Sequence, residues 1–252
     1  MGVQTFHPEL LRRLGRRQET LDALPEAVSL LRQNGIRNLG FDLIYAIPGQ
    51  TMEQWQQDLE AVSALSPQHV SAYALTLEEG TRLAEQFNVQ AIDEDLSFEM
   101  WELAGDFLKQ QGMPRYEISN YASEQWEAEH NQNIWHGQSY LGLGPAASSF
   151  DGLIRWTEVS SLTRWLQGQQ AETDEIPRPQ RIAEIFLMGL RTVRGWSRTE
   201  FFNCVPDAVT CEDLFLRLEK LKKLNLLTDD GDRIKLTGQG LAFWNDVAEM
   251  LL

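Results

Sequence analysis

A carboxylate stands inside an apolar segment near the start of the chain. Asp42 lies in IRNLGFDLIYAIP, residues 36–48, between Phe41 and Leu43 and close to Leu39. Such a segment is typical of a buried strand in a parallel sheet. A buried carboxylate costs free energy unless something pairs with it, so Asp42 either forms hydrogen bonds within the protein or meets a ligand. Both interpretations are open on these residues alone, and the neighbouring segments favour the ligand.

Two further polar residues are placed where their side chains could contact such a ligand. Gln4 ends a short first strand, and Arg16 follows the next predicted helix. Ligands of parallel half-barrels bind at the carboxyl ends of the strands, which places Gln4 and Asp42 at one mouth, within reach of Arg16. An amide and a carboxylate bond hydroxyls or an amine, and a guanidinium pairs with a carboxylate. Without other context, Arg16 is more often a surface charge and Gln4 an ordinary strand-end amide.

His130 is the histidine whose surroundings favour a function. In the segment HNQNIWHG it could bind a metal, bind heme iron or form a hydrogen bond within a loop. The last role is the commonest for an isolated histidine beside an asparagine. His136 is the second candidate, whereas His7 and His69 have no neighbours that single them out.

Composition narrows the class of protein. The chain has 252 residues, 42% of them hydrophobic, with eight Trp and eleven Phe, which is enough for a sizeable core. Its net charge of -15 argues against a general nucleic-acid binder. Neither a long apolar run nor a basic-then-apolar leader is visible, so we expect no membrane span and a cytoplasmic location. Cys204 and Cys211 fit neither an iron-sulfur triad nor a zinc pair, and we interpret them as reduced thiols.

Hydrophobic periodicity predicts alternating helices and strands in the first part of the chain. We expect a helix over 20–34, a strand over 36–47, a helix from the N-cap Thr51 through 65, and a strand over 69–77. This alternation is the signature of parallel α/β layers joined by right-handed crossovers. It predicts the second half of a (β/α) half-barrel.

The rest of the chain has a different pattern. A helix is predicted over 95–111, and residues 113–160 are expected to form short strands and loops. After prolines in 175–180, we expect helices over 182–195 and 211–227, a hairpin turning at Asp230 and Gly231, and a closing helix over 239–252. Helices with a hairpin suggest a winged-helix-like α+β domain. Acidic and basic residues alternate on its candidate recognition helix, which favours packing over DNA binding.

Four segments together resemble a known family. They are GVQTFHPELLRRLGR, FDLIYAIPGQT, YEISNYA and HNQNIW, at residues 2–16, 41–51, 116–122 and 130–135. In this order they are similar to radical S-adenosylmethionine proteins of the oxygen-independent coproporphyrinogen oxidase group, especially its HemW heme-chaperone branch. The resemblance implies an α/β fold: the C-terminal half of a radical SAM partial barrel over 1–112, an irregular segment packed on it over 113–175, and a winged-helix-like domain over 176–252.

The resemblance also implies roles for individual residues. Residues matching Gln4, Arg16 and Asp42 contact S-adenosylmethionine in the family, and the region of His130 is proposed to bind heme. The motif YAIPGQT marks the family, and its residues Tyr45, Pro48, Gly49 and Gln50 form the loop above the strand, where a glycine allows a ligand to approach the backbone.

Three residues depart from the pattern of the branch. Ile134 replaces the usual Tyr, Ala128 stands where many members have Cys, and Ser148 stands where many have His. The last two differences bear on heme ligation.

The family's cluster motif CxxxCxxC does not occur in these residues, because it lies upstream of the matched segments. We therefore expect an N-terminally truncated member with no radical activity of its own, which could pair with a chain that supplies the rest of the barrel. The expected function is to bind heme and pass it to apo-hemoproteins. The alternatives are an oxygen-independent coproporphyrinogen III oxidase and a non-catalytic winged-helix interaction protein. In the parent family the cofactors are S-adenosylmethionine and a 4Fe-4S cluster.

Overall fold

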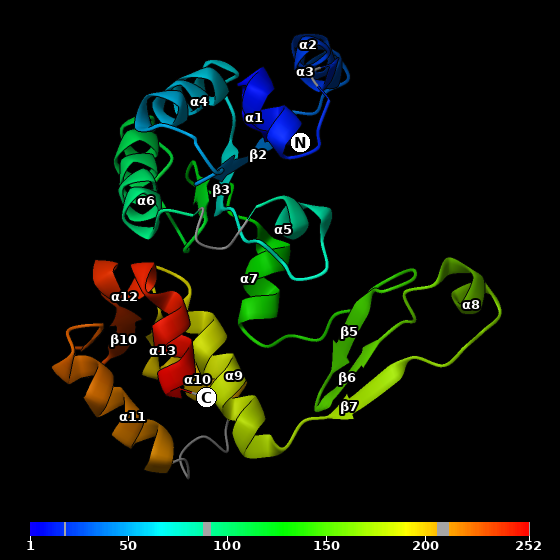
Figure 1. The fold of residues 1–252 in the computed structure, drawn as a ribbon. Coiled ribbons are helices and arrows are strands. Elements are labelled where there is room, and N and C mark those ends of the chain that lie inside the picture. Colours follow the sequence, from blue (N-terminus) through cyan, green and yellow to red (C-terminus); the bar gives the residue numbers. More distant parts are fainter. Residues whose placement is uncertain (18, 88–91, 206–211, 252) are drawn as a thin grey trace. The chain divides into compact units, whose positions relative to one another are not determined.

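The chain forms two compact units in the computed structural model (Figure 1). Residues 1–17, 19–87, 92–205 and 212–251 are described. The first unit spans Met1–Glu127 and the second Ala128–Leu252. The predicted division into three segments, with boundaries at 112 and 175, stays a prediction.

The first unit is built on one mixed sheet. Its strands are β1 (Gly2–Gln4), β2 (Gly40–Tyr45), β3 (His69–Ala74) and β4 (Asn120–Ala122), in that order across the sheet. β1, β2 and β3 are parallel, as the alternation of helices and strands predicts. β4 runs antiparallel to β3, so the sheet is mixed and open.

Helices connect these strands. They are α1 (Pro8–Arg13), α2 (Glu19–Asp22), α3 (Leu24–Gln33), α4 (Met52–Ala64), α5 (Arg82–Gln86) and α6 (Glu94–Gln110). The predicted helix over 20–34 is split in two, because Pro25 stands at the start of α3 and cannot continue a preceding helix. The predicted start at Thr51 is confirmed. Thr51 and Gln54 form a reciprocal capping box.

The core of the first unit lies between its sheet and two of its helices. α4 and α6 pack against each other (Figure 1), and α4 contacts β2 while α6 contacts β3. Trp55 is fully buried, and its indole Nε1 donates a hydrogen bond to the carbonyl of Met100 at 2.8 Å. Residues that alternate along β2, such as Phe41 and Leu43, fill the core from the sheet. The carboxyl ends of the parallel strands are thereby held in fixed positions.

Ala46, which follows β2, adopts an unusual backbone conformation. Its φ is 57°, in the left-handed region, where a Cβ atom is unfavourable. Glycine has no such cost, so we expect Ala46→Gly to raise the free energy of unfolding by about 1 kcal/mol. Urea unfolding measures the change. The matched control Ala61→Gly, inside α4, should lower it by about 1 kcal/mol instead. If both variants change the free energy of unfolding in the same direction, the left-handed conformation of Ala46 is contradicted.

The second unit contains two antiparallel sheets. One has the order β8 (Trp196–Ser197), β10 (Arg233–Leu236), β9 (Leu227–Asp229), and the other β5 (Ser148–Asp151), β6 (Ile154–Thr157), β7 (Glu172–Glu175). The helices are α7 (Glu129–Trp135), α8 (Leu162–Leu166), α9 (Arg178–Leu190), α10 (Arg198–Cys204), α11 (Glu212–Lys223), α12 (Gly238–Ala242) and α13 (Trp244–Leu251). Among the described residues, none of the helices has the length and apolar character to span a membrane.

The hairpin and the closing helix differ in detail from the prediction. Three residues, not two, separate β9 from β10, and the Asp230 carboxylate accepts hydrogen bonds from the backbone N–H groups of Asp232 and Arg233 at 3.0 and 2.7 Å. Gly231 has a φ of 93°, which favours glycine. The closing helix is broken at Phe243, whose φ and ψ of -96° and 41° are not helical.

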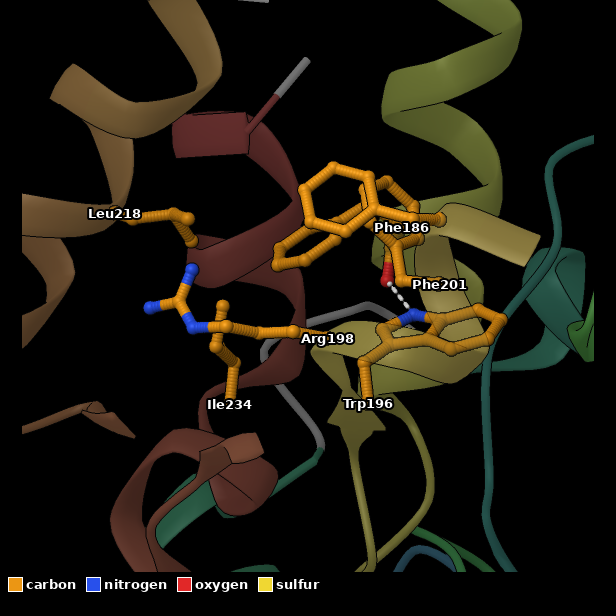
Figure 2. A pocket seen from close by; sticks show the side chains of 7 residues that line it. Phe186, Trp196, Arg198, Phe201, Leu218 and Ile234 are labelled. Carbon is orange, nitrogen blue, oxygen red and sulfur yellow. Dashed lines mark hydrogen bonds between the residues drawn. The ribbon is translucent and has the colours of Figure 1, made fainter. Parts of the chain in front are cut away.

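The core of the second unit is centred on Trp196, which is 1% exposed. Its indole Nε1 donates a hydrogen bond to the carbonyl of Phe186 at 2.9 Å, and its ring lies 5.4 Å from that of Phe201 (Figure 2). A Cβ atom added at Gly189 would lie 2.2 Å from the indole, so only glycine fits there. The cavity beside these rings holds about 10 Å³, which is too little for a ligand.

Candidate functional site

The carboxyl ends of the parallel strands surround a hollow of about 540 Å³, a size typical of small-molecule sites. It opens beside β1, β2 and β3. The residues that line it are Gln4, Asp42, Ile44, Tyr73, Ala74, Leu75 and Thr76. The structure thus brings Gln4 and Asp42 together, at the edge of the sheet where ligands of parallel α/β folds bind.

Asp42 faces this hollow. Its side chain is 44% exposed, so it differs from the buried carboxylate that its apolar neighbours predict. Successive side chains of a strand point to opposite faces of the sheet, which explains the difference: Phe41 and Leu43 point to the core and Asp42 points to the other face. A Cβ atom added at Gly2 would lie 2.8 Å from the Gln4 Nε2 and 4.0 Å from the Asp42 Oδ2, so this glycine makes room for both polar groups.

Arg16 is not among the residues that line the hollow. It follows α1 and Gly15, whose φ is 69°, and the backbone N–H of Arg16 donates to the carbonyl of Leu11 at 2.8 Å. Its side chain is exposed. A role for Arg16 in ligand binding stays a prediction.

The loop after β2 contacts protein groups rather than the hollow. Tyr45 is buried with its ring 5.3 Å from that of Trp55, and burial raises the pKa of its phenol. Gly49 has a φ of 77°, and the group that approaches it is the guanidinium of Arg13, which donates a hydrogen bond to the carbonyl of Pro48. In this structure the glycine therefore accommodates a side chain of the same chain.

Asp58 is a fully buried carboxylate that the sequence analysis missed. It accepts hydrogen bonds from the hydroxyl of Thr5 at 2.8 Å, the backbone N–H of Phe6 at 2.6 Å and the amide of Gln50 at 3.3 Å. The Nε2 of His7 lies 3.8 Å from it. A signal was available, because helical spacing places Asp58 among the buried residues of α4, one turn after Trp55.

Burial raises the pKa of Asp58 from its ordinary value of 3.8 to about 6, and its hydrogen bonds and His7 oppose this shift. The folded protein therefore holds the proton more tightly than the unfolded chain, so the contribution of Asp58 to stability increases as the pH falls through 6 towards 4. Relative to Asp58→Asn, we expect the wild type to gain about 2 kcal/mol between pH 7.5 and 4.5. Urea unfolding, followed by amide exchange in α4, measures the difference at each pH.

Glu60→Gln is the matched control for this pH dependence, because Glu60 lies exposed on the same helix. Its stability should run parallel to that of the wild type across the pH range. If the stability of Asp58→Asn also changes with pH in the same way as that of the wild type, the raised pKa of Asp58 is contradicted.

His69 also has a partner that the sequence did not indicate. Its Nε2 lies 2.8 Å from the hydroxyl of Tyr116, in the segment YEISNYA. Burial lowers the pKa of His69, and the nearby Asp42 opposes this shift. In the same segment, Glu117 is fully buried and accepts hydrogen bonds from the Ser119 N–H at 2.7 Å and the Asn120 amide at 2.6 Å. This segment thus shapes the turn into β4.

His130 lies on a helix, α7, and not in the predicted loop. Its side chain is exposed. His136, at the end of the same helix, is half-buried: its Nδ1 lies 2.7 Å from the carbonyl of Gln132, and its ring meets that of Trp196 edge-on at 4.9 Å. Of these two histidines, His130 is the one whose imidazole faces solvent.

The positions that depart from the heme-chaperone pattern lie in the second unit as well. Ala128 precedes α7, and Ile134 is half-buried within it. Ser148 is exposed at the start of β5, where its hydroxyl lies 3.0 Å from that of Thr157.

Cys204 belongs to no metal centre in the part of the chain that is described. Cys204 ends α10 as an exposed residue with a free thiol, and partial desolvation of that thiol raises its pKa. Cys211 lies outside the described residues. No group of three His, Cys, Asp or Glu side chains within residues 1–17, 19–87, 92–205 and 212–251 is arranged to hold a metal ion.

Comparisons with known proteins place this geometry in a family. The model of the Radical SAM superfamily matches residues 1–62, which contain both Gln4 and Asp42. The heme chaperone HemW of Lactococcus lactis subsp. lactis is 30% identical over 100% of this chain and 68% of that protein. The chain belongs to the HemW family of radical SAM proteins. HemW of Escherichia coli is similar too, with 29% identity over 100% of this chain and 67% of that protein.

A solved structure shares the fold of this chain. The coproporphyrinogen III oxidase HemN of Escherichia coli aligns with a TM-score of 0.81, covering 100% of this chain and 63% of that chain at 19% identity. This likeness shows a mixed α/β fold of the HemN type. The chain spans about two thirds of the length of the HemW proteins that it matches.

The radical SAM family implies S-adenosylmethionine and a 4Fe-4S cluster, and the two fit this chain differently. The hollow of about 540 Å³ is large enough for S-adenosylmethionine, and Gln4 and Asp42 offer it an amide and a carboxylate. A 4Fe-4S cluster is held by cysteine thiolates. The 252 residues contain only Cys204 and Cys211, which do not form the CxxxCxxC motif.

Proposed function

We propose that this chain binds heme through the region of His130 and passes it to apo-hemoproteins. The observation that carries the proposal is the 30% identity with a heme chaperone over the whole of this chain. The exposed imidazole of His130 supports it, because heme can approach an exposed imidazole and histidine is a common ligand of heme iron. His136 is a poorer ligand, since its ring is packed against Trp196.

A second part of the proposal concerns S-adenosylmethionine. We assign its site to the hollow at the carboxyl ends of β1, β2 and β3. There the carboxylate of Asp42 would accept hydrogen bonds from hydroxyl or amino groups, and the amide of Gln4 would both donate and accept. Arg16 would pair with the carboxylate of the ligand from the loop after α1.

A third part of the proposal concerns the two domains and the exposed edge of the first sheet. We interpret the first unit as half of a radical SAM partial barrel and residues 176–252 as a winged-helix-like domain. β1 is the outermost strand of its sheet, and an apolar recess of about 260 Å³ lies beside Val3 and Leu24. These features support pairing of β1 with a strand of a partner chain that supplies the rest of the barrel.

The alternative functions have less support. The likeness to HemN, at 19% identity, carries the fold and not the oxidase activity. The net charge of -15 argues against DNA binding, and on α11 the ammonium of Lys222 is already paired, at 2.8 Å from Glu219 and 4.0 Å from Asp229. Arg198 pairs with Asp229 at 2.6 Å. These ion pairs favour packing, so we do not propose nucleic acid as a partner.

Titration with ferric heme tests the proposed function. We expect saturable binding with a defined stoichiometry and a shift of the Soret band that signals ligation of the iron. Transfer is then measured by mixing the loaded protein with apo-myoglobin and following the spectrum of the acceptor. A featureless, non-saturating titration would overturn the heme-chaperone proposal.

A further inference from the structure

The backbone of Gln4 adopts a conformation that its neighbours must impose. Its φ is 70°, in the left-handed region that residues other than glycine rarely occupy. Gln4 pairs with Leu43, but the register of β1 against β2 shifts between Gly2 and Gln4, so the ladder is irregular at this residue. Such strained residues persist only where the surrounding structure fixes them, and they are frequent at ligand sites.

The residue that follows Gln4 is anchored to a buried carboxylate. Thr5 is fully buried, and its hydroxyl lies 2.8 and 3.1 Å from the two oxygens of Asp58. The next backbone N–H, that of Phe6, donates to the same carboxylate at 2.6 Å. Asp58 thus binds two consecutive residues of the turn that leaves β1.

The same carboxylate also holds the loop that leaves β2. The amide of Gln50 donates to Asp58 at 3.3 Å, and the Gln50 Oε1 accepts the backbone N–H of Ile47 at 3.2 Å. Gln50 is itself buried. One side chain on α4 therefore joins the ends of the two strands that carry Gln4 and Asp42 towards the hollow.

We propose that Asp58 is a positioning residue for the S-adenosylmethionine site, which it serves by locking the turn after β1 so that the amide of Gln4 faces the hollow. The inference rests on the proposed function of that hollow. Asp58 does not line the hollow, so it acts through Thr5 and Gln4 rather than by touching the ligand. A hydrogen-bonded carboxylate is suited to this task, because charge-assisted hydrogen bonds are short and directional.

Equilibrium dialysis with S-adenosylmethionine tests the proposal on the full chain. Asp58→Asn and Thr5→Val should each weaken binding about tenfold, the effect of one lost hydrogen bond to a charged group. Thr5→Ser keeps the hydroxyl and should bind like the wild type. Glu60→Gln, an acid-to-amide change at an exposed position of α4, is the matched control and should also bind normally.

The combination with Gln4→Ala separates positioning from a general loss of structure. If Asp58 acts through Gln4, the double variant Gln4→Ala with Asp58→Asn should bind no more weakly than Gln4→Ala alone. The proposal would be overturned if the losses of affinity in Gln4→Ala and Asp58→Asn multiply in the double variant. It would also be overturned if Asp58→Asn and Thr5→Val bind S-adenosylmethionine like the wild type. Should Asp58→Asn fail to fold, Thr5→Val provides the same test with a volume-conserving change.

Amide exchange of the ligand-free protein distinguishes this inference from the proposed function. In Asp58→Asn, the amides of Phe6 and Ile47 should exchange faster while those in the middle of α4 stay protected. If the wild type binds no S-adenosylmethionine but the amides of these loops exchange faster in the variant, the assignment of the ligand is wrong. The role of Asp58 in holding the two loops is then still supported. If the amides of both loops keep their protection, the role of Asp58 is refuted whatever the ligand does.

Discussion

Replacing Trp196 by alanine should destabilise the second unit by about 3–5 kcal/mol, the range for removing a large buried aromatic side chain. Trp196 is 1% exposed, donates a hydrogen bond to Phe186 and lies 5.4 Å from the ring of Phe201 (Figure 2). Its indole also packs closely over Gly189. The side chain leaves a cavity when it is removed, because its neighbours belong to a helix and a sheet that cannot simply close over it. Amide exchange in α9 at increasing urea concentration measures the loss.

Two further variants define what Trp196 contributes. Trp196→Phe keeps an aromatic ring but loses the indole N–H, so its stability should lie between that of Trp196→Ala and that of the wild type. Gly189→Ala should also be strongly destabilising, because its new methyl group would lie 2.2 Å from the indole. Trp126→Ala is the control, since Trp126 is 40% exposed and lies in the first unit. A loss below 1 kcal/mol for Trp196→Ala would contradict this account of the core.

The second large effect concerns heme. We expect His130→Ala to weaken the binding of ferric heme at least about tenfold, because even the loss of a group that only orients a metal ligand costs 10–100-fold. The Soret band should also move, since the axial ligand sets the spectrum of the iron. Titration of the variant beside the wild type, followed in the visible range, measures both effects.

A matched histidine and a rescue variant make the heme prediction specific. His136→Gln removes the imidazole packed against Trp196 and should leave the Soret position unchanged. His130→Cys offers a thiolate in place of the imidazole and should restore affinity with a different spectrum. If His130→Ala binds heme like the wild type with an unchanged Soret band, the iron ligand lies elsewhere and the assignment of His130 is wrong.

The helices and strands of the first unit follow largely from local sequence. Thr51 and Gln54 mark the start of α4 because a capping box needs only residues three positions apart. α6 begins after Asp93 and ends at Gln110, close to the predicted limits. Two of the candidate site residues, Gln4 and Asp42, could be placed together from the sequence, since parallel strands end at the same edge of their sheet.

Other parts of the candidate site were outside the reach of local sequence. The exposure of Asp42 and the helix that carries His130 differ from what their neighbours predict. Helical spacing could have placed Asp58 on the buried face of α4, but it could not have identified Thr5 as its partner or Arg13 as the neighbour of Gly49, because these contacts join segments more than 30 residues apart.

The sequence by itself determined the family, the order of helices and strands, and the sharing of one strand edge by Gln4 and Asp42, because each of these depends on spacing along the chain. The tertiary structure alone decided which groups are buried and which are reachable. Asp58 binds the turn after Thr5 and stays out of the hollow, while His130 faces solvent and His136 packs on Trp196. A periodic pattern indicates which face of a helix or strand is buried, but the hydrogen bonds and ring contacts between distant segments depend on tertiary packing, and no local pattern of residues specifies them.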